Sequence, residues 1–190
     1  MRSHLPLLLA LLVPTTAGAQ QYAVRLDGTV DYVQLGNLDP GADFTFEAWV
    51  QADATPINQA VVSAANLVDG LNAFLVGHVA GDWTVELEDD DVFEGDDCGS
   101  GALCVSQAFS AGVPTHVAVA VSGATATLYV NGALLGSYTS GAAPTWGTET
   151  WVLGAETDGA GFGADAFNGL IDEVRIWGSA RSQADIQCTM

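Results

Sequence analysis

The sequence has no lysine, and its only permanently cationic side chains are four arginines, set against 23 aspartates and glutamates. The formal net charge of the 190-residue chain is therefore −19. A protein that binds nucleic acid or an anionic membrane uses basic side chains to neutralise phosphates, so this composition excludes both classes of partner. It predicts instead a surface that repels anions and attracts divalent cations.

The chain also lacks a hydrophobic run long enough to cross a bilayer, which takes about 20 residues. An apolar stretch at residues 5–13 follows the charged first residues and precedes the small residues A-G-A at 17–19. That order of segments is typical of a secretory signal peptide. We expect residues 1–19 to be removed and the mature protein to be secreted, either extracellular or on the cell surface.

Cysteine is scarce, with three residues in the whole chain. In an exported protein, Cys98 and Cys104 within "CGSGALC" are expected to form a disulfide that closes a short loop. A zinc site is the alternative, but the spacing is not C-x-x-C, and His78 and His116 belong to unrelated segments. Cys188 is left over, either as a free thiol or as the partner of a cysteine outside this chain.

Long helical patterns are absent as well, and only "SARSQADI" near the end favours a helical turn. Alternating strands fill the rest of the chain, and the clearest hairpin is "ATLYVNGALLGSY", whose Asn131-Gly132 pair prefers a type I′ turn. Short strands separated by glycine-rich turns predict an antiparallel sandwich or barrel. We therefore expect residues 20–190 to form one all-β domain.

Four blocks of this sequence carry a resemblance to a known family: "LDGTVDYVQLG", "FTFEAWV", "THVAVAVSGATATLYVNGALLGS" and "FNGLIDEVRIWGSARSQADI". In this order they resemble the LamG-like, concanavalin A-like jelly-roll domains of secreted proteins. The resemblance implies a sandwich of two antiparallel sheets. It also implies a non-catalytic binding or adhesion module, whose partner is a glycan or an extracellular protein, often with bound calcium.

Asp172 raises the question of a metal. Alternation along "GLIDEVRIW" places it on the same face as three apolar side chains, Leu170, Val174 and Ile176. A buried carboxylate needs a partner or a metal ion, and calcium accepts carboxylate and carbonyl oxygens. Related jelly-roll glucanases end in a D-x-V-R-V strand whose aspartate holds calcium. That resemblance implies Asp172 as a ligand, with the Asp27 side chain or the Gly28 carbonyl beside it. The alternative is that Asp172 lies at the strand edge and accepts backbone N–H groups.

The acidic segment "ELEDDDVFEGDDCG" suggests two further possibilities. A second cation site in the loop fails the EF-hand pattern, so a solvated run of charge is the preferred interpretation. The other possibility is a hydrolase, because jelly-roll glucanases carry their catalytic acids on one strand as E-x-D-x-(x)-E. Glu86, Glu88 and Asp90 would share a face, as paired carboxylates in glycoside hydrolysis must. The match is imperfect at two positions, so hydrolysis is kept as the alternative to a binding module.

The aromatic residues give only weak candidates for ligand contact. Trp49, Trp83 and Trp177 are expected to pack in the core or at its rim. Trp146 and Tyr138 are the candidates for an exposed platform on which a sugar could stack. The leading hypothesis is therefore a secreted binding module with a structural calcium, and a further possibility is that the chain is one piece of a longer adhesin.

Overall fold

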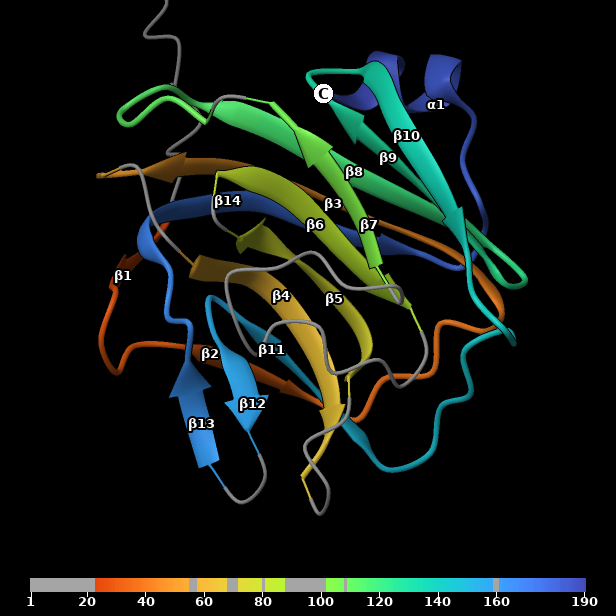
Figure 1. Ribbon diagram of the computed structural model, residues 1–190, viewed down its shortest axis with the longest axis horizontal. Coiled ribbons are helices and arrows are strands. Elements are labelled where there is room, and N and C mark those ends of the chain that lie inside the picture. Colours follow the sequence, from red (N-terminus) through yellow and green to blue (C-terminus); the bar gives the residue numbers. More distant parts are fainter. Residues whose placement is uncertain are drawn as a thin grey trace, which may run out of the picture.

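The computed structural model describes residues 23–54, 58–67, 72–79, 81–87, 102–107, 109–158 and 161–190. These residues form fourteen strands and one helix (Figure 1). The elements are β1 (Val24–Asp27), β2 (Val33–Gly36), β3 (Asp43–Ala52), β4 (Asn58–Asn66), β5 (Asn72–Val79), β6 (Asp82–Leu87), β7 (Ala102–Ser106), β8 (Thr115–Ser122), β9 (Thr125–Val130), β10 (Ala133–Thr139), β11 (Glu149–Leu153), β12 (Glu156–Asp158), β13 (Gly161–Ala164), β14 (Asn168–Trp177) and α1 (Gln183–Thr189).

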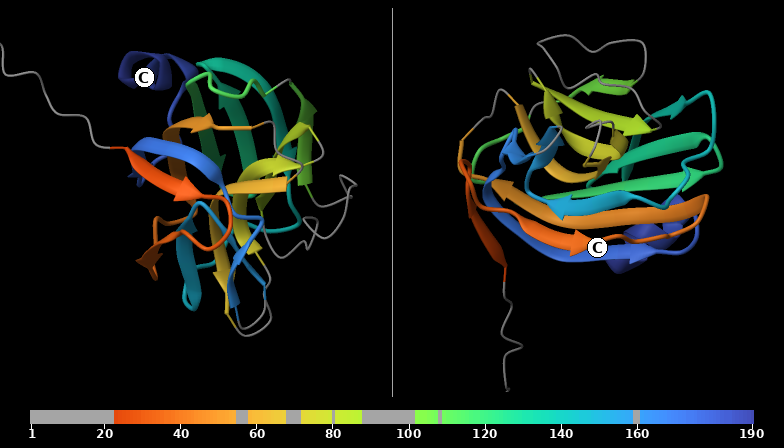
Figure 2. Two further views of the ribbon diagram at one scale, coloured as in Figure 1. Left: turned by 90° about the vertical axis from the view of Figure 1, so that its left-hand side faces the viewer. Right: turned by 90° about the horizontal axis from the view of Figure 1, so that it is seen from below.

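Twelve of the strands build two six-stranded antiparallel sheets that pack face to face (Figure 2). Sheet A has the order β1-β14-β3-β8-β9-β10, and sheet B has the order β2-β11-β4-β5-β6-β7. Strands β12 and β13 form a separate two-stranded hairpin. The predicted all-β, two-sheet antiparallel jelly-roll sandwich is confirmed.

The core lies between the two sheets and follows the alternation of the sequence. In β3 the residues Phe44, Phe46, Ala48, Val50 and Ala52 are buried in the core, and β8 adds its three valines at 117, 119 and 121. The β9–β10 hairpin turns at Asn131 and Gly132, whose φ angles of 49° and 70° fit the predicted type I′ turn.

The last strand departs from the predicted alternation. Asp172 is paired with Trp49 and Arg175 with Glu47, so two residues of β14 stand opposite one residue of β3. This is a β-bulge, and Glu173 in it has a φ of 50°. Before the bulge, Ile171 points into the core, and after it Val174 and Ile176 pack against the core. The expectation that Asp172 shares a face with Val174 and Ile176 is therefore wrong, and Asp172 lies half-buried on the outer face.

The chain beyond β14 folds back over the outer face of sheet A, on the side away from sheet B (Figure 2). The Thr45 hydroxyl donates to the Ser179 carbonyl at 2.9 Å and accepts from the Arg181 N–H at 2.9 Å. Helix α1 begins with a capping box between Ser182 and Asp185, which confirms the predicted helical turn, and its Ile186 is fully buried. Within the described residues, no helix has the length and apolarity that a membrane crossing requires.

Gly169 offers a test of the strand packing at the start of β14. It pairs with Leu26 on one side and Ala52 on the other, at a φ of 153°. A Cβ there would lie 2.8 Å from the Ala52 Cα and closer still to the Gln51 carbonyl oxygen. We expect Gly169→Ala to lower the free energy of unfolding by about 2 kcal/mol or more, because backbone has to shift.

Chemical denaturation measures this effect, with Gly141→Ala as the matched control, because nothing lies within 4 Å of a Cβ at that position. Equal stability of the two variants would contradict the packing described for β14.

Candidate functional site

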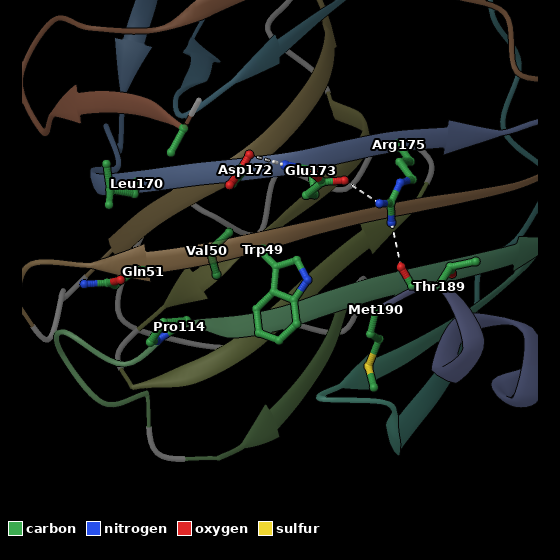
Figure 3. A pocket seen from close by; sticks show the side chains of 11 residues that line it. Trp49, Val50, Gln51, Pro114, Leu170, Asp172, Glu173, Arg175, Thr189 and Met190 are labelled. Carbon is green, nitrogen blue, oxygen red and sulfur yellow. Dashed lines mark hydrogen bonds and ion pairs between the residues drawn. The ribbon is translucent and has the colours of Figure 1, made fainter. Parts of the chain in front are cut away.

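The outer face of sheet A carries a pocket of about 560 Å³, which we call the outer pocket (Figure 3). Strands β3 and β14 form its floor, and Thr189, the last residue of α1, and Met190, the C-cap of that helix, line one side. Its other principal side chains are Trp49, Gln51, Asp172, Glu173 and Arg175. The pocket therefore combines one indole ring with an amide, two carboxylates and a guanidinium.

A buried ion pair supports one side of the outer pocket. The Glu47 side chain is fully buried, and its Oε1 accepts from Arg175 Nη1 at 3.2 Å and from the Thr189 hydroxyl at 3.4 Å. Arg175 also donates to the Thr189 carbonyl at 2.9 Å and pairs through Nη2 with Glu173 (Figure 3). One guanidinium thus joins two carboxylates to the end of the chain, which fixes α1 against the strands.

His116 is directly opposite Trp49 on the neighbouring strand β8 and is fully buried. The two rings contact edge-to-face, with a centroid distance of 5.4 Å. Neither of its ring nitrogens has a hydrogen-bond partner within the described part of the chain. Burial lowers the pKa of His116; the Glu47 carboxylate opposes this effect, and the Arg175 guanidinium adds to it. His116 is therefore neutral near pH 7, and it is an uncharged edge-to-face neighbour of Trp49.

The predicted calcium ligands are not brought together. Asp27 is paired with Asn168, four residues before Asp172 on β14, which corresponds to about 13 Å along the strand. The Asp27 carboxylate accepts from the backbone N–H groups of residues 29–31 and from the Thr29 hydroxyl, and these bonds, led by the Thr29 hydroxyl, lower its pKa. No group of three or more metal-ligating side chains occurs among the described residues.

A calcium ion shared by Asp172, Asp27 and Gly28 therefore does not fit this geometry. Asp172 accepts the backbone N–H of Glu173 at 2.8 Å, although β14 is an inner strand of sheet A and not the edge that the alternative assumed. Calcium bound at one of these residues alone stays a prediction.

The hydrolase alternative involved a strand that the structure describes only in part. Glu86 is fully buried on β6, whereas Glu88 and Asp90 lie outside the described residues. The fold brings Glu156 near Glu86, and Asn72 bridges the two carboxylates. Its Nδ2 donates to Glu86 at 3.4 Å and to Glu156 at 2.5 Å. No local motif in the sequence signals this pairing, since the two glutamates belong to distant strands.

The other predicted residues have packing roles or lie outside the description. Trp146 packs on the core, 5.2 Å from Trp151 between ring centroids, and its Nε1 donates to the Gly41 carbonyl at 2.9 Å. Tyr138 also packs against the core. Cys188 is an exposed free thiol on α1. The predicted disulfide involves Cys98 and the predicted signal peptide covers residues 1–19, both outside the described residues, so both stay predictions.

Comparison with known proteins places this geometry in a family. A model described as the concanavalin A-like lectin/glucanases superfamily matches residues 27–187. One similar solved structure is a carbohydrate-binding module, CBM40, of a Ruminococcus gnavus sialidase bound to α2,3-sialyllactose, with 18% identity, a TM-score of 0.66 and coverage of 87% of this chain and 95% of that one. A second is domain 4 of a Geobacillus stearothermophilus arabinanase with arabinotriose, with 18% identity, a TM-score of 0.61 and coverage of 87% and 75%. A third is a Limulus polyphemus pentraxin, with 16% identity, a TM-score of 0.63 and coverage of 86% and 78%. No curated protein sequence matches the chain.

The ion pair between Glu47 and Arg175 is open to a direct test. Arg175→Met leaves a buried carboxylate without its charge partner, and we expect it to lower the free energy of unfolding by about 2–4 kcal/mol. Adding Glu47→Gln removes the stranded charge, so the double variant is expected to recover at least half of that loss. A double-mutant cycle by chemical denaturation measures the coupling, and strictly additive effects would rule out the pair as a stabilising contact.

Stability is expected to depend on pH through the two buried histidines. Burial lowers the pKa values of His116 and His78 below the ordinary value of 6.5. The unfolded chain therefore binds more protons than the folded chain just below pH 6.5, so the free energy of unfolding falls as the pH drops from 7 to 5. His116→Phe is expected to flatten this dependence, as measured by urea denaturation at each pH, and an unchanged slope would contradict the assignment.

Proposed function

The chain belongs to the concanavalin A-like lectin/glucanases superfamily, and from this premise we propose that it is a secreted, non-catalytic carbohydrate-binding module. Three observations on similar proteins support the choice of ligand. The Ruminococcus gnavus structure holds sialyllactose and the Geobacillus stearothermophilus structure holds arabinotriose, and the first of these is itself a carbohydrate-binding module. Secretion is proposed from the signal-peptide pattern of residues 1–19, and the module works outside the cell or on its surface.

The outer pocket carries the proposal. Trp49 offers an aromatic face, on which the C–H groups of a sugar ring can stack, and its ring contacts that of His116 edge-to-face. Gln51 and Asp172 lie beside it and can bond to hydroxyl groups. An apolar surface flanked by a few fixed polar groups is the usual composition of a small-molecule site. A sugar ring has both kinds of surface.

The non-catalytic part of the proposal depends on access to the carboxylates. Glycoside hydrolysis needs two carboxyl groups on either side of the scissile bond. Glu86 and Glu156 are both buried, at 0% and 2% exposure, and Asn72 binds them together. A substrate does not reach carboxylates in that state, so we assign the pair to the contact between the β12–β13 hairpin and sheet B.

We expect oligosaccharide binding that depends on Trp49. Trp49→Ala removes the stacking surface and is expected to weaken binding at least tenfold, by isothermal titration calorimetry with short oligosaccharides. Trp146→Phe is the control, because Trp146 packs on the core and does not line the outer pocket. Equal affinity of the wild type and a folded Trp49→Ala variant would show that the sugar binds outside the outer pocket. Release of reducing ends from the oligosaccharides would contradict a non-catalytic module.

A further inference from the structure

We propose that the outer pocket selects glycans that carry free amino groups, and that it rejects acidic glycans. This inference rests on the proposed function, because it names the class of carbohydrate that the same pocket takes. It differs from what the similar sialidase module binds, since sialyllactose is an anion.

The pocket has an excess of negative charge. Asp172 and Glu173 line it, and Glu47 lies beneath it, whereas among the described residues Arg175 is the only cationic side chain in its lining. Three carboxylates and one guanidinium give a net charge of −2. His116 adds no positive charge near pH 7, because burial lowers its pKa.

Arg175 is not available to bind an anionic ligand. Its Nη1 donates to Glu47 and to the Thr189 carbonyl, and its Nη2 pairs with Glu173. A sialic acid carboxylate would have to displace one of these partners, and displacing Glu47 would leave a buried charge without its partner. The two remaining arginines in the described part of the chain also have partners. Arg25, which lies on β1 opposite the pocket residue Leu170, pairs with Asp53, and Arg181 stacks on Trp177.

A cation, in contrast, meets two complementary groups at one point. Asp172 is directly opposite Trp49 across the β14–β3 ladder, so a carboxylate stands next to an indole ring (Figure 3). An ammonium group is attracted both by the carboxylate and by the face of the ring. The net charge of −19 also raises the local concentration of cationic ligands around the molecule. An amino sugar presents an ammonium group and a stacking surface in one ring.

The test compares three trisaccharide-sized probes by isothermal titration calorimetry in low salt at pH 6: a glucosamine trimer, its N-acetylated counterpart and 3′-sialyllactose. Acetylation keeps the sugar and removes the charge, so the first two probes differ mainly in the ammonium groups. We expect the glucosamine trimer to bind at least tenfold more tightly than the acetylated trimer, and sialyllactose to bind most weakly.

Two charge-matched variants separate the pocket from the overall charge. Asp172→Asn keeps an oxygen for the Glu173 N–H but removes the charge, and we expect it to abolish most of the preference for the glucosamine trimer. Asp31→Asn makes the same change of net charge on an exposed side chain that does not line the pocket, and we expect it to leave the preference intact.

Each outcome decides a different point. Equal or tighter binding of the acetylated or sialylated probe overturns the amino-sugar preference while leaving carbohydrate binding in place. An equal effect of Asp31→Asn and Asp172→Asn also overturns it, because the preference would then come from overall charge. Failure of all three probes to bind overturns the proposed function and, with it, this inference.

Discussion

The bulge at Asp172 and Glu173 sets the chemistry of the outer face of sheet A. Without the additional residue, strict alternation in β14 would keep Ile171 and Arg175 on the same face, so either an apolar side chain would leave the core or a guanidinium would enter it. The bulge places Ile171, Val174 and Ile176 in the core and both Asp172 and Arg175 on the outer face. This combination depends on one local irregularity of the backbone.

The second constraint is the buried charge of Glu47. A carboxylate on the outer face of a sheet is ordinarily solvated, but here the end of the chain covers it, and Arg175 has to neutralise it. The same arginine donates to the Thr189 carbonyl at the end of α1. The Glu47–Arg175 ion pair, which α1 helps to bury, therefore also attaches the helix to the sheet. The outer pocket is thus assembled from a strand, a bulge and a helix that share one guanidinium.

Much of the fold could be predicted from the sequence, because the information is local. The alternation in β3 and β8, the Asn131-Gly132 turn and the helical turn in "SARSQADI" each depend on neighbouring residues, and each is confirmed. The order of the four sequence blocks gave the family. The charge of the chain likewise follows from composition alone.

The candidate site was much harder to predict, because its residues meet only in the folded chain. The bulge changes which face follows Asp172, and nothing in "GLIDEVRIW" marks the extra residue before the backbone is known. Trp49 was expected to be a packing residue, and its place in a pocket depends on how Met190 and Asp172 approach it. The pairing of Glu86 with Glu156 through Asn72 is likewise a contact between distant strands.

The place of β14 in sheet A also has a consequence for how the chain folds. The last strand lies between β1 and β3, so the first strand joins the sheet only through residues near the other end of the chain. Val24 pairs with Ile171, which makes this a contact between very distant positions, and such contacts slow folding because a large loop must close first. Until β14 is inserted, one edge of β3 stays open to other chains. Folding of this protein is therefore expected to be slow and to be completed at its C-terminal end.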